Sequence, residues 1–263
     1  MLNALLHRIG LDGPVEPTLD GLVHVHRAYL GAIPYEDIAV QLGETGPLAS
    51  AALAERFLSE GRGGYCFEVN TVFSWLLEQL GFSVERHQAV VGGEGPTNHM
   101  ALVVDIDGSL WIADAGLGEG FVDPLPLEPG THAIGPFAWT VELEPCGTWW
   151  IGAHEWSTFS GFRMDEDPSP VSAFEPHHRR LATDPESSFV KTLVVQRPRA
   201  DRIDTLRART FSSVGPGVAE KRVLDEAEFW AVLSGEFGIT RRDPRLWALA
   251  VAQHDAFLAA RAA

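Results

Sequence analysis

A change in hydrophobic period at Gly81 is the feature that most constrains how this 263-residue chain folds. Before Gly81, a helix is expected from about residue 65 or 66 to residue 80, because apolar residues recur there at i, i+3, i+4, i+7, i+8 and i+11. The segments 18–30 and 48–58 carry the same helical pattern. After Gly81, apolar runs predict strands at 84–91, 100–106 and 110–113. Helices followed by strands indicate an α+β fold.

The remainder of the chain predicts more strands and two terminal helices. The stretch 131–162, rich in Trp, Phe and Gly, indicates further antiparallel strands of a small barrel. A polar connector that contains proline is expected at 165–170. Further strands are expected at 189–195 and 204–211, and helices at 225–237 and 244–262. The predicted molecule is an α+β protein of up to three lobes.

Charge and cysteine content exclude several classes of protein. Asp and Glu number 36 against 20 Lys and Arg, a net charge of −16, so neither nucleic acid nor an anionic membrane is expected as a main partner. The two cysteines, Cys66 and Cys146, cannot build a disulfide framework or a cysteine-based zinc site, and no metal is expected. No apolar run approaches the roughly 20 residues of a membrane span, and residues 1–13 show no secretion signal. A reducing, cytoplasmic compartment with free thiols is therefore expected.

The segment from Arg62 to Asn70 carries the strongest indication of chemistry. Gly63 and Gly64 allow the backbone to turn sharply and to approach another group closely. Cys66 then falls in the first turn of the predicted helix, where free N–H groups and the helix dipole stabilise a thiolate. The alternative is that Cys66 is buried and packs as a small apolar residue.

A thiolate nucleophile needs a base, and the base needs an orienting group. Asp107-Gly108 predicts a two-residue hairpin loop, so residues opposite each other have numbers that sum to 215. In this register His99 and Asp114 are diagonal neighbours on one face of adjacent strands. A buried Asp114 needs a partner, and the imidazole of His99 would be one. The alternatives are a core histidine and a strand-end carboxylate that accepts from the turn at 116–118.

Other reactive side chains receive structural interpretations. Arg62, Glu68 and Glu36 are expected to form ion pairs around the glycine-containing loop, in a supporting role rather than a catalytic one. The His-His-Arg-Arg run at 177–180 is interpreted as a solvated loop, because two adjacent histidines lack a third ligand at a recognisable metal-binding spacing. Cys146 has no identifiable base beside it and is interpreted as a structural residue.

Several segments resemble the arylamine N-acetyltransferase family. Residues 62–70 match its Arg-Gly-Gly-x-Cys-x-Glu-x-Asn signature. Upstream, residues 33–37 resemble its Pro-Phe-Glu-Asn segment. After the signature, residues 98–103 match the strand of its catalytic histidine, residues 114–118 resemble its Asp-Val-Gly-Phe-Gly turn, and Phe121 with 124–125 fits the segment after that turn. Residues 183–191 and 195–197 resemble a downstream stretch of the family. The matches run from about His26 to Arg197 and so cover most of the chain.

The resemblance implies a fold, a site and an activity. It implies a helical lobe at 1–83 that carries the nucleophile, a central antiparallel β-barrel at 84–180 that carries the His and Asp, and a C-terminal α/β lid at 181–263. The implied site is a papain-like triad of Cys66, His99 and Asp114. The expected enzyme is an acyltransferase with acetyl-CoA as donor and an aromatic amine or hydrazine as acceptor. It works by ping-pong transfer through an acyl-cysteine.

Departures from the family pattern bear on the substrate. Asp37 replaces the family's Asn, and Ala115 and Leu117 replace Val and Phe. Leu117 and Phe121 are expected to line the substrate pocket, which the smaller Leu117 would widen, and core packing is the alternative for Phe121. The second candidate function is therefore an amide synthase. Such members of the family take a long acyl chain from a carrier protein and close it into a lactam.

Two further functions are compatible with the same side chains. A thiol hydrolase would use the triad with water, whereas a binding protein that keeps the fold would have no need of an intact Cys, His and Asp set. A donor such as CoA or an acyl carrier protein is itself anionic. Because the chain is acidic overall, the donor site is expected to rest on a local basic patch. The candidates for this patch are Lys191, Arg197 and Arg199.

Overall fold

The first part of the chain is helical, as its periodicity predicts. The computed structural model describes residues 1–262. The helices of this part are α1 (Leu2–Arg8), α2 (Leu19–Ala32), α3 (Ile38–Leu42), α4 (Ser50–Glu60) and α5 (Cys66–Gln79). Gly61 ends α4 with a φ of 64°, and Gly81 follows α5 with a φ of 90°. Such left-handed positions favour glycine after a helix. The helices predicted near 18–30, 48–58 and 66–80 are thus confirmed.

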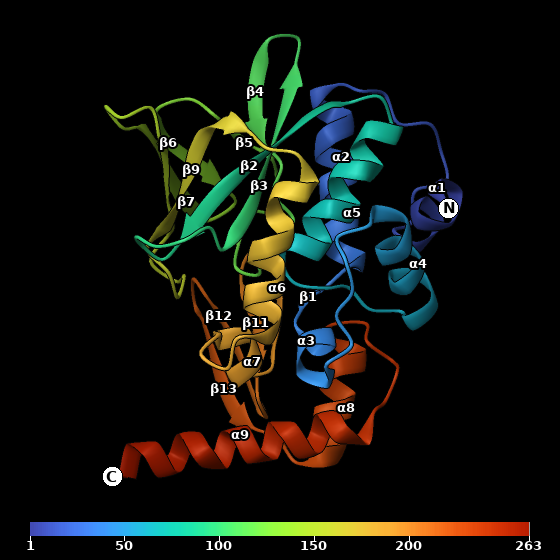
Figure 1. The fold of residues 1–263 in the computed structure, drawn as a ribbon, viewed down its shortest axis with the longest axis vertical. Helices are drawn as coiled ribbons and strands as arrows, with labels where there is room; N and C mark the ends of the chain where they lie inside the picture. The colour runs from blue at the N-terminus through green and yellow to red at the C-terminus, as the bar shows by residue number, and fades with distance from the viewer. Residues whose placement is uncertain (263) are drawn as a thin grey trace.

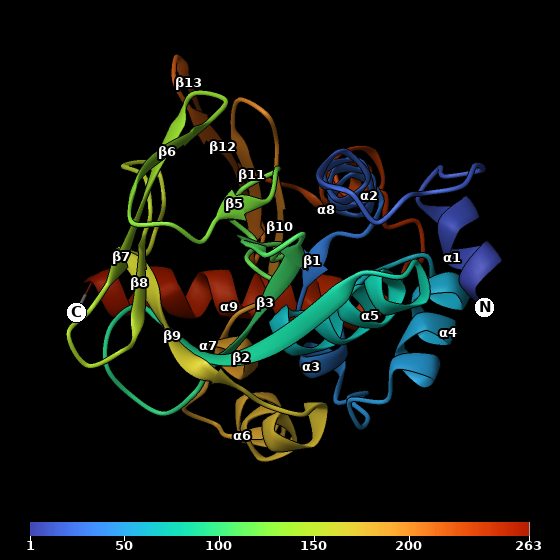
Figure 2. The same ribbon diagram turned by 90° about the horizontal axis from the view of Figure 1, so that it is seen from above.

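Eight antiparallel strands form a nearly closed barrel beside these helices (Figure 1). The strands are β2 (Ser83–Val91), β3 (His99–Ile106), β4 (Ser109–Ile112), β5 (Leu125–Pro126), β6 (Gly130–Ile134), β7 (Phe137–Leu143), β8 (Trp149–Gly152) and β9 (Gly161–Pro168). Their order in the sheet is β5-β4-β3-β2-β9-β8-β7-β6. The view from above shows this curved sheet next to α5 and α2 (Figure 2). The predicted barrel is confirmed.

Strand β3 is apolar on both faces because each face belongs to a different core. Met100, Leu102 and Val104 pack with the helices in one hydrophobic cluster. Ala101 and Val103 point the other way and join the barrel interior. Side chains alternate across a strand, so one strand serves two cores. This placement ties the end of β3 firmly to α5, which matters for the site described below.

A second sheet of five antiparallel strands completes the molecule. Its strands are β1 (Tyr35–Glu36), β10 (Val194–Pro198), β11 (Ile203–Arg207), β12 (Thr210–Gly215) and β13 (Val218–Val223), in that order. Although β1 lies far back in the sequence, Tyr35 pairs with Gln196 of β10 and forms a bridge to Gly64. The sheet therefore reaches into the loop that precedes α5.

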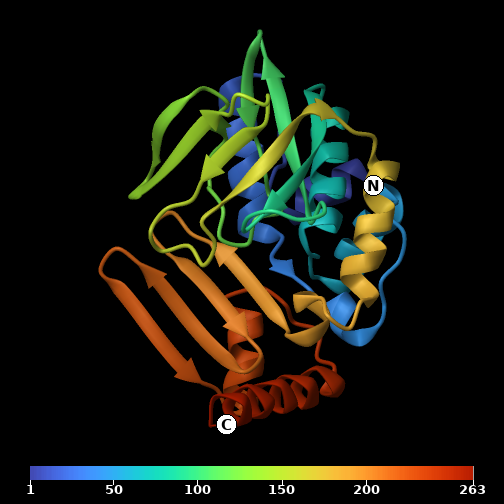
Figure 3. The same ribbon diagram turned by 60° about the vertical axis from the view of Figure 1, so that its left-hand side comes forward.

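The C-terminal helices cover one face of this second sheet. The elements after the barrel are the 3-10 turn η1 (Val171–Phe174), α6 (Glu175–Thr183), α7 (Ser188–Lys191), α8 (Glu226–Gly235) and α9 (Pro244–Ala262). Leu206 and Phe211 of the sheet form a third core with Phe229 of α8 and Leu246 of α9. Figure 3 shows the orange strands of this sheet with the red helix α9 across their ends. No helix within residues 1–262 has the length and apolar character needed to cross a membrane.

Three predictions of strands and their connectors are wrong. The expected connector at 165–170 is largely the end of β9, whose backbone pairs with β2 across a bulge. The strand expected at 189–195 begins as α7, and β10 starts only at Val194. The strand expected at 204–211 is two strands, separated by a turn in which Ala208 has a φ of 48°. In each case backbone pairing, rather than side-chain hydrophobicity, decides where the strand begins or ends.

Candidate active site

Cys66 is the first residue of α5, and close backbone contacts place it there. A Cβ atom on Gly63 would lie 2.0 Å from the carbonyl oxygen of Pro34, and one on Gly64 would lie 2.5 Å from Oε2 of Glu68. The glycine pair is therefore required for close approach, as the sequence indicated. The Tyr65 N–H donates to Oε2 of Glu68 at 3.4 Å, which fixes the first turn of α5.

The thiol of Cys66 lies in a buried and only weakly polar environment. Its exposed fraction is 3%, and its Sγ lies 3.5 Å from the carbonyl oxygen of Asn98. Burial raises the pKa of the Cys66 thiol, and the backbone N–H of Phe67 opposes this shift only in part. The helix start alone does not supply a stable thiolate. Ionisation of this thiol requires a base that keeps the proton inside the site.

His99 and Asp114 meet on the hairpin, in the register that the sequence predicts. Val103 pairs with Ile112, so that numbers of opposite residues sum to 215. Nε2 of His99 lies 2.5 Å from Oδ2 of Asp114, and both side chains are buried. With Nε2 engaged by the carboxylate, Nδ1 is the ring nitrogen left for a reaction partner.

Asn70 holds the carboxylate of Asp114, a role that the sequence interpretation missed. Its Nδ2 donates to Oδ1 of Asp114 at 2.7 Å and to the carbonyl oxygen of Met100 at 2.6 Å. Its Oδ1 accepts from the N–H of Ala115 at 3.1 Å. Asn70 is four residues after Cys66 and so lies on the same face of α5. That spacing is the signal by which the sequence could have revealed it.

Gly116 allows the aspartate turn to lie directly against the start of α5. Its N–H donates to Oδ1 of Asp114 at 2.8 Å. A Cβ atom on Gly116 would lie 2.7 Å from Nδ2 of Asn70 and 3.0 Å from Cα of Cys66. Any larger residue must therefore displace the nucleophile, the amide that holds Asp114, or both.

A Gly116→Ala variant is expected to lose about 10²-fold in kcat, because it displaces the reacting groups from one another. It should also lower the free energy of unfolding by about 1–3 kcal/mol. Steady-state kinetics and denaturant unfolding measure the two effects. Gly31→Ala is the matched control, because a Cβ at this position in α2 meets no atom within 4 Å and the change should stabilise the helix slightly. Full activity of Gly116→Ala would contradict the proposed packing.

Cys66 and His99 line the same pocket, which has a volume of about 260 Å³. Its other walls come from all parts of the chain and include Tyr35, Asn98, Leu117, Phe159, Phe189 and Arg207. Asp114 lies behind His99, away from this space. The structure therefore places the candidate nucleophile Cys66 and the candidate base His99 on one cavity, with the carboxylate of Asp114 beyond His99.

Of the two residues expected to line the substrate pocket, the structure places only Leu117 there. Phe121 is 2% exposed and belongs to the barrel core. Its ring packs edge-to-face on Trp139, with ring centroids 5.3 Å apart. The pocket role of Phe121 is corrected to core packing. Phe121 belongs to the same hydrophobic cluster as Trp139 and Val141 of β7 and does not line the cavity.

Comparison with known proteins assigns this arrangement to a family. A family model described as N-acetyltransferase matches residues 18–244. The chain belongs to this N-acetyltransferase family. It is an enzyme, an acyltransferase whose fold is that of the arylamine N-acetyltransferases.

Three relatives illustrate the range of this N-acetyltransferase family. The arylamine N-acetyltransferase of Mycolicibacterium smegmatis is 29% identical over 259 residues, which cover 92% of this chain and 93% of the relative. The proansamycin X synthase of Amycolatopsis mediterranei is 27% identical over 260 residues, or 90% and 98% of the two chains. The solved structure of Mycobacterium marinum arylamine N-acetyltransferase in complex with CoA has a TM-score of 0.86 at 26% identity and covers 95% of this chain and 98% of that one.

The residues expected to form a basic patch are engaged with other groups of the protein itself. Lys191 pairs with Glu186 at 2.7 Å. Arg197 is buried and donates to the carbonyl oxygens of Glu236 and Phe237. Arg199 pairs with Asp204 at 2.7 Å. The expectation that Lys191, Arg197 and Arg199 form a free donor patch is therefore wrong, because each already has partners.

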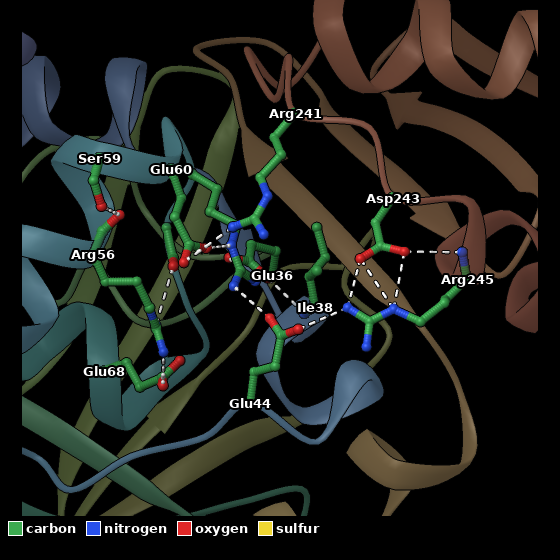
Figure 4. Close-up of polar contacts among 12 residues, drawn as sticks. Glu36, Ile38, Glu44, Arg56, Ser59, Glu60, Glu68, Arg241, Asp243 and Arg245 are labelled. Carbon is green, nitrogen blue, oxygen red and sulfur yellow. Dashed lines mark hydrogen bonds and ion pairs between the residues drawn. The ribbon is translucent and has the colours of Figure 1, made fainter.

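Ion pairs brace the loop before α5, as the sequence predicts (Figure 4). Arg62 is buried and lies 2.5 Å from Glu60, 3.7 Å from Glu36 and 3.8 Å from Glu44. Glu68 pairs with Arg56 at 2.8 Å rather than with Arg62. The cluster extends to the start of α9, because Arg241, just before this helix, contacts Glu60 and Arg245, in its first turn, contacts Glu44. These contacts fix the loop from outside the pocket.

The remaining candidates lie away from the pocket. His178 is in α6 rather than in a loop, and its ring bonds the hydroxyl of Tyr65 and the carbonyl oxygen of Gly46. Cys146 is an exposed, free cysteine in the turn between β7 and β8. Within residues 1–262, no group of three or more His, Cys, Asp or Glu side chains is placed to hold a metal ion.

Proposed function

We propose that this enzyme transfers an acyl group, in the first instance acetyl, from a CoA thioester to an aromatic amine or hydrazine through an acyl intermediate on Cys66. The observation that carries this proposal is the shared cavity of Cys66 and His99, with Asp114 bonded to the far nitrogen of His99. The family relatives named for arylamine acetylation and the solved complex with CoA support the choice of substrates.

In the first half-reaction, the Sγ–H proton of Cys66 passes to Nδ1 of His99. Asp114 accepts the Nε2–H bond, which sets the tautomer with a free Nδ1 and stabilises the imidazolium that forms. The resulting ion pair offsets the cost of burying a thiolate, which raises the pKa of Cys66 when no proton acceptor is present. The Cys66 sulfur attacks the thioester carbonyl, the C–S bond of the donor breaks, and the leaving CoA takes the proton from His99.

In the second half-reaction, the amine attacks the carbonyl of acyl-Cys66. His99 takes a proton from the amine nitrogen, and the C–S bond to Cys66 breaks as the amide forms. The two steps share one site, so ping-pong kinetics follow. Backbone N–H groups at the start of α5 are the proposed oxyanion donors, because Cys66 is the first residue of this helix and its first N–H groups have no partner within the helix.

An amide synthase is the second candidate, and one observation favours it. The pocket of Cys66 and His99 shares Glu119, Thr158 and Arg207 with a larger pocket of about 570 Å³. An acyl chain longer than acetyl could occupy this additional space. Proansamycin X synthase, which matches the chain over nearly its whole length, supports such a reaction. In this case the first half-reaction is the same and only the donor and acceptor differ.

The intact mass of the protein after incubation with acetyl-CoA tests the proposal. We expect one acetyl group on Cys66, which a panel of arylamines and hydrazines then removes. Labelling only by longer acyl thioesters would favour the amide synthase. Loss of the acetyl group to water, with no amine required, would indicate a hydrolase instead.

Because the nucleophile needs a reduced thiol and both cysteines are free, we propose the cytoplasm as the compartment.

A further inference from the structure

The larger pocket is formed by the face of the second sheet that α8 does not cover. Residues of β11, β12 and β13 alternate, and every second one points into it. One cross-strand row consists of Thr205, Ser212 and Lys221. The next row consists of Arg207, Thr210 and Val223. The pocket wall thus places two cations diagonally on either side of a group of hydroxyls.

Helix α9 and the barrel complete the pocket. The C-terminal half of α9 contributes His254, Phe257 and Arg261 among its wall residues. From the barrel side come Glu119, Trp156 and Thr158. Thr158, Glu119 and Arg207 also line the pocket of Cys66, so the two cavities adjoin. A ligand that extends along the sheet can therefore reach the nucleophile.

Three cations of this pocket have no acidic partner. In residues 1–262, no carboxylate lies within 4 Å of the cationic groups of Arg207, Lys221 or Arg261, whereas most other arginines of the chain have an ion-pair partner. The chain has a net charge of −16 and only 20 Lys and Arg residues. Three unpaired cations on one pocket of such a protein form a local positive site for an anion.

The one acidic side chain of the pocket is already satisfied. Glu119 is 3% exposed. Its carboxylate accepts from Nε2 of Gln196 at 2.7 Å and from the backbone N–H and Oγ1 of Thr158 at 2.6 and 2.8 Å. Ser157 donates a fourth hydrogen bond at 3.1 Å. Glu119 therefore links the barrel loop that contains Ser157 and Thr158 to Gln196 of β10. Because its carboxylate is occupied by these neutral donors, it forms no ion pair with the three cations.

We propose that Arg207, Lys221 and Arg261 bind the phosphate of a 4′-phosphopantetheine thioester, whose arm runs past Thr158 to Cys66. This inference rests on the proposed acyl transfer. Phosphate is the matching chemistry because its oxygens accept from both cations and hydroxyls, and Thr205, Thr210 and Ser212 supply the hydroxyls beside the cations. An extended donor is required because Lys221 and Arg261 line only the larger pocket.

CoA and an acyl carrier protein both present this phosphopantetheine group. The site therefore recognises the group that the two donors share. The KM values of the donors show which of them the enzyme uses. If acetyl-CoA reacts with a lower KM than S-acetyl-4′-phosphopantetheine, the nucleotide adds binding and CoA is the source. If acetyl-CoA and S-acetyl-4′-phosphopantetheine have equal KM values and an acetylated carrier protein has a lower KM than either, the carrier protein is the source. This comparison identifies the source of the phosphopantetheine, whereas the following variant tests the phosphate site itself.

The variant Lys221→Met tests the site, because it removes one cation and keeps a chain of similar length. We expect its KM for acetyl-CoA and for S-acetyl-4′-phosphopantetheine to rise about 3- to 10-fold, and the salt dependence of KM to weaken. The KM for S-acetylpantetheine, which carries no phosphate, should stay unchanged. Arg222→Met is the matched control, because Arg222 is on the other face of β13 and pairs with Glu220 and Glu228.

The outcomes separate this inference from the function on which it rests. p-Nitrophenyl acetate, a phosphate-free ester, reports whether Cys66 accepts an acyl group at all. If Cys66 is acylated but Lys221→Met and Arg222→Met show the same KM for all phosphate donors, the phosphate site is overturned and the acyl transfer stands. If no ester or thioester acylates Cys66, the proposed function fails and the inference fails with it.

Discussion

Replacing Cys66 by serine is expected to lower the rate of acyl transfer by about 10³-fold or more. The serine hydroxyl is a far weaker acid than a thiol, so proton transfer to His99 becomes much less favourable. Burial already disfavours the anion of Cys66 and would disfavour an alkoxide further. Steady-state kinetics with acetyl-CoA and an arylamine measure the loss, and intact mass should show no stable acyl group.

The structure of the Cys66→Ser variant should remain intact. The serine hydroxyl can donate to the carbonyl oxygen of Asn98, which lies 3.5 Å from the present sulfur. Tm should therefore change by no more than about 3 °C. Cys146→Ser is the matched control, because Cys146 is exposed in a turn of the barrel, and its activity should equal that of the unchanged enzyme. A Cys66→Ser enzyme with near-normal turnover would exclude Cys66 as the nucleophile.

The parts of the fold that the sequence predicts well are those with strong local periodicity or turn chemistry. The apolar repeat that ends at Gly81 predicts α5 to within a residue or two. Asp107-Gly108 predicts the β3–β4 hairpin and its register, and Asp107 and Gly108 both have positive φ, as a tight turn of this kind requires. Both features depend strongly on neighbours in the sequence, so local patterns are enough to predict them.

The elements that escaped prediction depend on partners far away in the chain. Residues 165–168 are polar and exposed, and only pairing with β2 makes them part of a strand. α6 contains a run of two histidines and two arginines, but it buries His178 and Leu181 against the N-terminal helices. Hydrophobic periodicity carries no information about such pairing, so a single sequence could not supply it.

The same limit applies to the site. The hairpin register brings His99 and Asp114 together, so this pair could be predicted. The role of Asn70 depends on the packing of α5 against β3 and the aspartate turn, which the sequence does not show directly. It is harder still to predict which lysines and arginines lack an acidic partner, because this depends on whether a carboxylate from elsewhere in the chain lies beside each one. Lys191 and Arg199 have acidic partners, whereas Lys221 has none in the described residues.

An Asp114→Asn variant is expected to lose about 10³- to 10⁴-fold in kcat while it keeps the fold, by analogy with the loss of the orienting aspartate in other triads. The geometry explains the size of the effect. Oδ1 of residue 114 accepts from Asn70 and Gly116, so the new amide must keep its oxygen there. Its NH₂ group then faces Nε2 of His99, which must become an acceptor.

An acceptor at Nε2 requires the proton of the neutral ring to move to Nδ1. The nitrogen that should take the proton of Cys66 is then already protonated, so His99 is in the wrong tautomer to act as a base. The pH profile of kcat and the yield of acyl-enzyme measure this loss. Asp105→Asn is the matched control on the same strand, because Asp105 is exposed and an asparagine can still accept from the N–H of Gly108. If Asp114→Asn retained a near-normal rate, Asp114 would be a structural support for the turn and His99 would act without it.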